Sequence, residues 1–294
     1  MPKKTAGSIY DLGYRRYGGV RLGRRHAFWA LYIQSLRGLF GIGRSLSSKV
    51  GPIGLAGIAF FPAVVQLGIA AIAPAEVEVL RPEDYNQMIE VVLAAFCAAV
   101  APELVGRDQR TQTLSLYFSR ALRRQDYALA KFAALVTGML AITAAPQLVM
   151  FVGNGLAAND FGDYLRDDWA DIPRILGSAL LLSVLVAAIG LVIAAQTRRR
   201  AYSTVGILAA FLLTSAVGAS LFEAADRDVG RFILLMSPFH IARGLTLWFF
   251  DVSPDPLSQL AEADLPGVMY AIQATAVALL MLALLLRRYE RISA

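Results

Sequence analysis

The stretch PRILGSALLLSVLVAAIGLVIAAQ, residues 173–196, decides the class of fold. As a helix it is long enough to cross a bilayer core of roughly 30 Å, and it has no charged residue after Arg174. The basic turn formed by Arg198, Arg199 and Arg200 follows almost at once. We therefore interpret residues 173–196 as a membrane-spanning helix with a basic exit.

Five further apolar stretches of spanning length flank this helix on both sides. The six predicted spans cover about 52–73, 88–105, 128–152, 173–196, 201–222 and 266–286. Hydrophobic residues make up 57% of the 294-residue chain and charged residues 17%, against roughly 25% charged residues in soluble domains. This composition excludes a soluble enzyme and a disordered chain. The predicted fold class is an all-α membrane protein with six transmembrane helices.

Basic and acidic residues alternate between the segments that connect these spans. Four segments hold 22 of the 28 Lys and Arg residues: 1–49, 106–131, 198–200 and 287–294. The other three connections are rich in Asp and Glu: 74–90, 153–174 and 223–265. Because basic loops stay in the cytoplasm, we predict cytoplasmic termini and a multi-pass protein of the cell membrane, most simply a bacterial plasma membrane. The net charge of +6 then reflects topology, and no nucleic-acid partner is expected.

The chain divides into a basic N-terminal segment, residues 1–49, and a transmembrane domain, residues 50–294. Apolar residues recur at helical spacing within 26–44, namely Phe28, Trp29, Tyr32, Leu36, Leu39 and Phe40. Polar or small residues fall on the other side, namely Gln34, Arg37, Gly41 and Arg44. This pattern predicts an amphipathic helix on the cytoplasmic surface of the lipid bilayer. A helix packed on another domain is the alternative.

Residues 230–250 are apolar and long enough to form a seventh span. They contain four residues that disfavour a straight crossing: Arg231, Pro238, His240 and Arg243. A crossing would bury charge and would place the basic C-terminal tail outside the cell. We predict instead two short helices broken near Pro238, which enter and leave on the outer face with Trp248 at the membrane interface.

Few residues in this chain are suited to catalysis or metal binding. There is no G-x-x-x-x-G-K-[ST] phosphate loop, no Ser/His/Asp set and no H-E-x-x-H pattern. Cys97 is the single cysteine, and His26 and His240 are the only histidines, which is too few for a zinc site built on thiolates or imidazoles. We therefore expect no enzymatic activity and no cofactor in this chain. The acidic loop at 160–171 has two interpretations. It binds a cation or a partner, or it is an ordinary loop exposed to water.

Two polar residues lie inside predicted spans, Gln66 and Gln147. Polar groups within a membrane tend to be functional, so both are candidates for a transport pathway. Ordinary hydrogen bonding between helices is the alternative, and the sequence does not separate the two interpretations.

The connection PELVGRDQRTQTLSLYFSRALRRQDYALAK, residues 102–131, is the most informative segment. Leu114, Tyr117 and Phe118 form one apolar side of a short helix, while Arg107, Arg110 and Arg120 supply positive charge. Such a helix is suited to docking into the groove of a soluble partner. A simple surface helix with extended arginine side chains is the alternative. Glu103 is expected to hold the two ends of the connection together by pairing with Lys131 or Arg107.

The order of these motifs resembles the ABC-2 type permease family. The residues that carry the resemblance are Glu103, Thr113-Leu114, Ser119-Arg120, Tyr127 and Lys131, and later Ser237-Pro238-Phe239-His240 and Leu247-Trp248. The resemblance extends over essentially the whole chain, including the six spans. One departure is Ala121, at a position where the family often has proline, so the end of the short helix is less defined.

The resemblance implies the transmembrane subunit of an ATP-binding cassette exporter with a type V exporter fold. A separate nucleotide-binding subunit would bind ATP and Mg and drive outward transport, and the permease would pair with a second copy or a related permease. A coupling helix would lie within 106–127 and external re-entrant helices within 230–250. The coupling residues would be Glu103, Arg107, Arg110, Leu114, Tyr117, Phe118, Arg120 and Lys131. An ion-coupled secondary transporter and a non-transporting membrane scaffold are the alternatives, and the substrate stays open.

Overall fold

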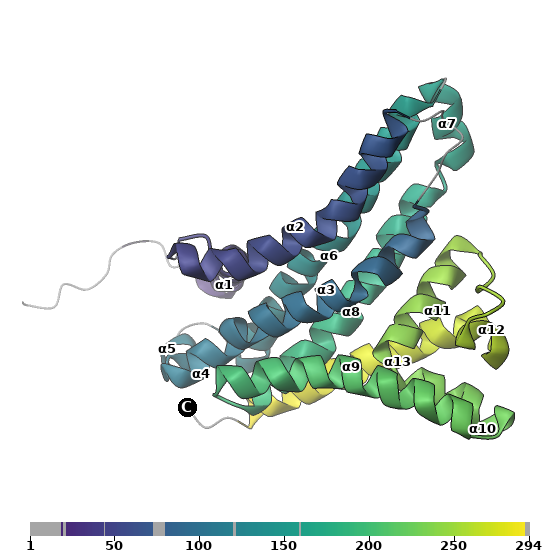
Figure 1. The fold of residues 1–294 in the computed structure, drawn as a ribbon. Helices are drawn as coiled ribbons and strands as arrows, with labels where there is room; N and C mark the ends of the chain where they lie inside the picture. Colours follow the sequence, from purple (N-terminus) through teal and green to yellow (C-terminus); the bar gives the residue numbers. More distant parts are fainter. Residues whose placement is uncertain are drawn as a thin grey trace, which may run out of the picture.

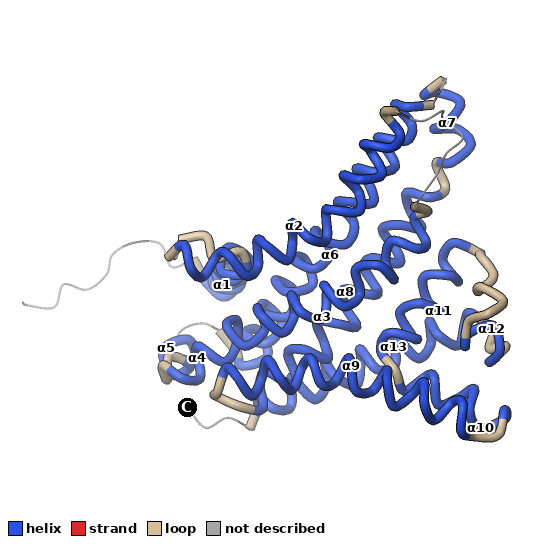
Figure 2. Tube along the Cα trace, viewed as in Figure 1, coloured by secondary structure: helices blue, strands red, loops and turns tan. Residues whose placement is uncertain are grey.

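The computed structural model describes residue 19 and residues 22–43, 45–72, 80–119, 122–158 and 160–291. Every regular element in these ranges is a helix (Figures 1 and 2). The predictions made for Arg44, Arg120, Ala121 and nearly all of residues 1–21 lie outside the described residues.

Six helices are long and apolar enough to cross a membrane. They are α2 (Leu46–Ala70), α3 (Pro82–Ala101) with its continuation, α6 (Arg124–Ala157), α8 (Asp171–Gln196), α9 (Arg200–Ala224) and α13 (Gly267–Glu290). All six fall on predicted spans, so the expectation of an all-α chain with six helices of spanning length is confirmed for the described residues. The arrangement is compatible with a multi-pass membrane protein.

Helix α8 is the centre of the bundle. Of its most apolar stretch 72% is buried, compared with 17% for α2 and 22% for α9. Neighbouring helices come close to α8 where it has glycine, since a Cβ added at Gly190 would lie 2.1 Å from Cys97 Sγ on α3. The exposed apolar faces of α2 and α9 suit contact with lipid, because a membrane helix needs no polar outer face.

Basic and acidic segments gather at opposite ends of the bundle (Figure 1). The basic end carries α1 (Gly23–Leu39), α4 (Arg107–Arg110), α5 (Leu114–Phe118), the turn before α9 and the last turns of α13. The acidic end carries α7 (Phe161–Asp168), α10 (Arg227–Ile233), α11 (Pro238–Phe250) and α12 (Gln259–Ala263). The side of the membrane that each end faces stays a prediction.

The basic segments contact one another, although they are far apart in the sequence. Arg24 donates two hydrogen bonds to Asp126, at 2.6 and 2.5 Å. Arg124 donates to the backbone carbonyl of Glu290 at 2.8 Å. The alternation of charge along the chain therefore becomes a separation of charge between the two ends of the molecule.

Residues 227–250 form two helices joined by a sharp corner. The segment α10 with η2 (Leu234–Met236) and helix α11 meet at 97°. Ser237 caps α11, and Pro238 occupies its first position, where the missing N–H has no partner to lose. Ser237 Oγ, at the corner, lies 2.8 Å from Ser215 Oγ. Ser215 is near the middle of α9, whereas α9 ends at the acidic end of the bundle. The predicted break near Pro238 is confirmed, and the corner reaches about halfway into the bundle.

Helix α1 packs against α6. Its buried stripe is Leu31, Ser35 and Leu39. Gly138 on α6 leaves space for Leu39, whose Cδ1 would lie 2.7 Å from a Cβ at that glycine. Trp29, by contrast, is 58% exposed. The apolar residues expected on one side of α1 therefore do not all lie on its buried side. The reason is that α6 supplies a packing surface that the local sequence pattern does not reveal.

Candidate functional site at the basic end

The helix of the second span continues past its predicted end. Pro102 begins the π-helical turn η1 (Pro102–Gly106), and α4 carries the chain on to Arg110. Turns of this kind are uncommon inside helices and frequently lie at functional sites. A tight turn with Gln112 at φ 54° then leads into α5. The predicted single short helix within 106–127 is therefore two short helices, α4 and α5.

Asp108 joins α4 to α6. Its Oδ2 lies 3.0 Å from Lys131 Nζ and accepts a hydrogen bond of 2.8 Å from the Tyr127 hydroxyl. The side chains of Lys131 and Asp108 are only 8% and 14% exposed, so little water screens this ion pair. Asp108 was not among the predicted site residues. The available signal was its position in a strongly basic connection, residues 106–131, where Asp126 is the only other acid.

Glu103 joins the end of α3 to the start of α9. Its Oε1 lies 3.2 Å from Arg200 Nη1 and 3.5 Å from Arg110 Nη2. The expected partners were Lys131 and Arg107. The structure adds Arg200, from the three-arginine turn, to the residues of this site.

Gln109 connects α4 to two further spans. Its Nε2 donates to the Ala195 carbonyl of α8 at 3.4 Å and to the Tyr289 hydroxyl of α13 at 3.3 Å. The Tyr289 ring in turn packs on Tyr127, with 5.1 Å between ring centres. Through Asp108, Glu103 and Gln109, the short connection therefore contacts α6, α8, α9 and α13.

The apolar side of α5 faces the interior of the chain. Leu114 is 8% exposed, and Tyr117 and Phe118 are half-buried with ring centres 5.6 and 6.0 Å from that of Tyr127. The chain's own core covers Leu114, which leaves little of its side chain to enter a partner's groove, and its role in a partner contact stays a prediction. Leu116 is the exposed apolar residue of α5, at 64%.

At the acidic end, α11 carries the residues predicted for the external element. His240 Nδ1 lies 2.8 Å from Ser237 Oγ, which stiffens the corner beside Pro238. Arg243 donates to the Glu83 carbonyl and to Asp84, both at 2.8 Å, and so holds α11 to the start of α3.

Trp248 lies on the outer side of α11 and is 44% exposed, as expected for an interface residue. Its two neighbours along the chain, Phe249 and Phe250, lie differently. Phe250 is buried instead and packs against Phe151 and Ile175, and Phe249 packs over Gly177. The start of α8 and the end of α6 provide this apolar surface.

Gln66 and Gln147 belong to two separate hydrogen-bonded groups. Gln147 donates to Asn86 at 3.0 Å, and Asn86 donates to Thr246 at 3.2 Å. Gln66 donates to Asn154 at 3.4 Å. Both glutamines are nearly fully buried. Hydrogen bonding between helices accounts for Gln66, whereas the buried Oε1 of Gln147 has no hydrogen-bond partner among the described residues. A role of either residue in a transport pathway stays a prediction.

The acidic loop at 160–171 folds around α7. Asp160 caps this helix and accepts hydrogen bonds from the backbone of Gly162 and Asp163 at 2.7 and 3.1 Å. Within the described ranges, no three His, Cys, Asp or Glu side chains are arranged to hold a metal ion.

A scan against protein-family models gives no match for this chain, and a search of curated proteins gives no relative. The resemblance to ABC-2 permeases therefore rests on the motifs and their arrangement.

Proposed function

We propose that this chain is the transmembrane subunit of an ABC-2 type exporter, driven by a separate ATPase subunit. The observation that carries the proposal is the α4–α5 connection. It is short, basic and partly apolar at its surface, and it contacts four of the six spans. A soluble motor protein that pushed on α5 would therefore displace several spans together.

The contacts suggest how force enters the membrane domain. Asp108 passes a displacement of α4 to α6 through a shielded ion pair with Lys131, and Gln109 passes it to α8 and α13. Glu103 passes it to α9 through Arg200. The π-helical turn η1 contains Glu103 and joins this group to the long part of α3, and such turns inside helices frequently lie at functional sites.

In this proposal the chain has no ATPase site, and ATP and Mg are bound by the partner. The permease pairs with a second copy of itself or with a related permease in a bacterial plasma membrane, with the basic end in the cytoplasm. The exposed apolar faces of α2 and α9 offer surface to lipid and to a second permease. The α10–α11 corner closes the outer half of the pathway, and the substrate leaves on that side.

The test is co-purification of the tagged full-length chain from its host membranes. We expect an ATPase subunit with a phosphate loop to co-purify, and the complex to hydrolyse ATP. Leu116→Glu should reduce recovery of the ATPase at least about tenfold, because it places a charge in the centre of the apolar contact. Leu257→Glu is the matched control, since Leu257 is 97% exposed at the acidic end.

One result would overturn the proposal, and another would exclude α5 as the docking element. One is a purified wild-type chain that carries no ATPase and transports in response to an ion gradient, which would indicate a secondary transporter. The other is an ATPase that binds the Leu116→Glu and Leu257→Glu variants equally well. The second result would remove α5 from the contact surface and would leave the six-helix fold unaffected.

A further inference from the structure

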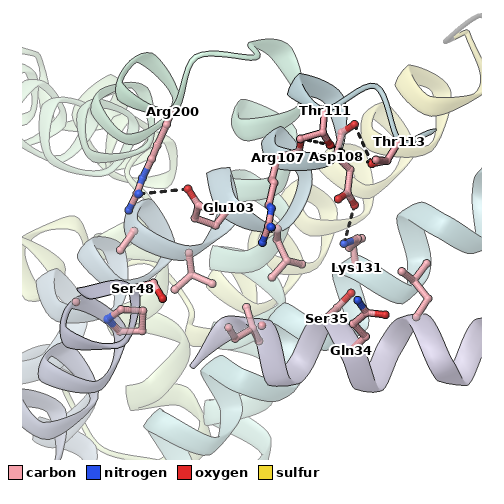
Figure 3. A pocket seen from close by; sticks show the side chains of 18 of the residues that line it. Gln34, Ser35, Ser48, Glu103, Arg107, Asp108, Thr111, Thr113, Lys131 and Arg200 are labelled. Carbon is pink, nitrogen blue, oxygen red and sulfur yellow. Dashed lines mark hydrogen bonds and ion pairs between the residues drawn. The ribbon is translucent and has the colours of Figure 1, made fainter. Parts of the chain in front are cut away.

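A polar cavity of about 440 Å³ lies at the basic end, between α1, the start of α2, the η1–α4 segment and the start of α9 (Figure 3). One part of its wall is apolar and comes from α1 and α3. The residues of that part are Leu31, Leu39, Ala99, Val100 and Leu104. The opposite part is charged. A cavity with an apolar wall and a few convergent polar groups is the usual form of a ligand site.

Three cationic side chains from three elements point into this cavity: Arg107, Lys131 and Arg200 (Figure 3). Lys131 pairs with Asp108, and Arg200 pairs with Glu103. Arg107 forms no ion pair with any residue that the structure describes. The lining residues that the structure describes include three cations and two carboxylates, an excess of one positive charge.

Ser35 provides a second, independent observation. It is 5% exposed and lines the same cavity from α1, and its hydroxyl has no hydrogen-bond partner among the described residues. A buried hydroxyl without a partner is unfavourable, so a ligand that accepts or donates a hydrogen bond here is favoured. Gln34 and Ser48 add further polar groups to the wall.

From these observations we propose that the cavity binds a phosphate group, carried by an anionic lipid headgroup or present as free phosphate. The Arg107 guanidinium offers two parallel N–H donors, which match two phosphate oxygens. The Ser35 hydroxyl donates a further hydrogen bond to one of these oxygens. The single excess positive charge matches the single negative charge of a phosphodiester, and the apolar wall suits the glycerol and acyl portion of a lipid. The site does not depend on the proposed ATPase partner.

The experiment uses the purified full-length chain in an uncharged detergent. Native mass spectrometry and titration measure binding of phosphatidylglycerol, with inorganic phosphate and laurate in parallel arms. We expect one phosphatidylglycerol to bind tightly and laurate to bind at least about tenfold more weakly, because laurate lacks the phosphoglycerol headgroup that the polar wall would contact. Competition by inorganic phosphate identifies free phosphate as a ligand. Failure of phosphate to compete assigns the site to lipid headgroups.

The variants separate this site from general attraction between a basic surface and anions. Arg107→Gln should weaken phosphatidylglycerol binding at least about tenfold, as expected for loss of a charged bidentate donor. Arg198→Gln removes the same charge from an exposed residue outside the cavity and should leave binding unchanged. Equal binding by these two variants overturns the proposal, and so does the absence of binding of both phosphatidylglycerol and phosphate.

Ser35→Ala distinguishes ligand binding from a structural role. It removes a hydroxyl with no partner in the described structure, so the ligand-free variant should unfold at the same temperature as wild type or higher. Its affinity for phosphatidylglycerol should nevertheless fall severalfold. A variant that loses thermal stability without losing affinity contradicts the site, as does tight binding of laurate.

Discussion

At the scale of single residues, a few charged side chains fix the geometry of both ends of the bundle. Asp108 accepts from Tyr127 and pairs with Lys131, so it positions α4 against α6. Arg243 has a comparable role at the acidic end, where it holds α11 to the start of α3. Both interactions connect segments that are distant in the sequence, and both are partly shielded from water.

Lys131→Met should lower the free energy of unfolding by about 3 kcal/mol. The substitution leaves the Asp108 carboxylate largely buried without its cationic partner, and breaking a buried pair costs more than the pair itself contributes. Denaturant unfolding in detergent checks this value. Asp108→Asn combined with Lys131→Met should recover part of the loss, because no unpaired charge remains. If Lys131→Met alone is as stable as wild type, the Asp108–Lys131 pair is exposed to water and the prediction fails.

Arg243→Gln should lower the free energy of unfolding by roughly 2 kcal/mol. The guanidinium is 17% exposed and makes two charge-assisted hydrogen bonds, each of which is worth more than a neutral one. The matched control is Arg166→Gln, because the Arg166–Asp163 pair is 83% and 72% exposed and contributes about 0–1 kcal/mol. Equal effects of the two substitutions would contradict the role given to Arg243.

At the scale of helices, close approach depends on where small residues meet. The α3–α8 contact places Gly190 directly against Cys97, and the end of α11 places Phe249 over Gly177. Small residues at such crossings let membrane helices pack tightly, which is the main source of their association. Helix α2 buries small residues as well, Ala59 and Ala63, on the side that packs in the bundle, and its other face stays exposed.

Gly190→Ala should lower the free energy of unfolding by about 1–3 kcal/mol, since the new methyl group overlaps Cys97 Sγ and forces the two helices apart. Thermal unfolding with a denaturant series measures the effect. Cys97→Ala in the same chain should restore stability by removing the overlapping sulfur. Gly57→Ala on α2 is the control, because no atom lies within 4 Å of the added methyl group. If the variant with both Gly190→Ala and Cys97→Ala is no more stable than Gly190→Ala alone, the overlap with Cys97 is not the cause of the destabilisation.

At the scale of the whole molecule, charge separates the two ends. The basic end gathers segments from four parts of the chain, and the acidic end gathers α7 and the α10–α12 region (Figure 1). Such a bundle has one preferred orientation in a cell membrane, because Lys and Arg near the ends of spans resist translocation. The orientation also decides which end a soluble partner can reach.

Cysteine labelling of intact cells tests this orientation. A membrane-impermeant maleimide should label Asp163→Cys in α7, because the acidic end is predicted to face outward. It should label Arg198→Cys only after the membrane is permeabilised. Cys97 is fully buried and gives a low background. Labelling in the opposite order would reverse the predicted topology and would place α4 and α5 beyond the reach of a cytoplasmic ATPase.

The sequence by itself determined the six helices, the separation of charge and the break at Pro238. These features depend on local quantities: the length of an apolar run, the cost of placing charge in a bilayer and the missing donor of proline. The motifs also located the connection at 102–131 as the place to look for a partner contact.

Only the tertiary structure decided which side of each short element is buried. Leu114 faces inward and Leu116 outward because Tyr127 and the surrounding core cover one side of α5, and α1 buries Ser35 because α6 lies against it. The partners of Asp108 and Glu103 likewise come from helices far along the chain. Such contacts depend on the packing of distant segments, which no local pattern of residues specifies.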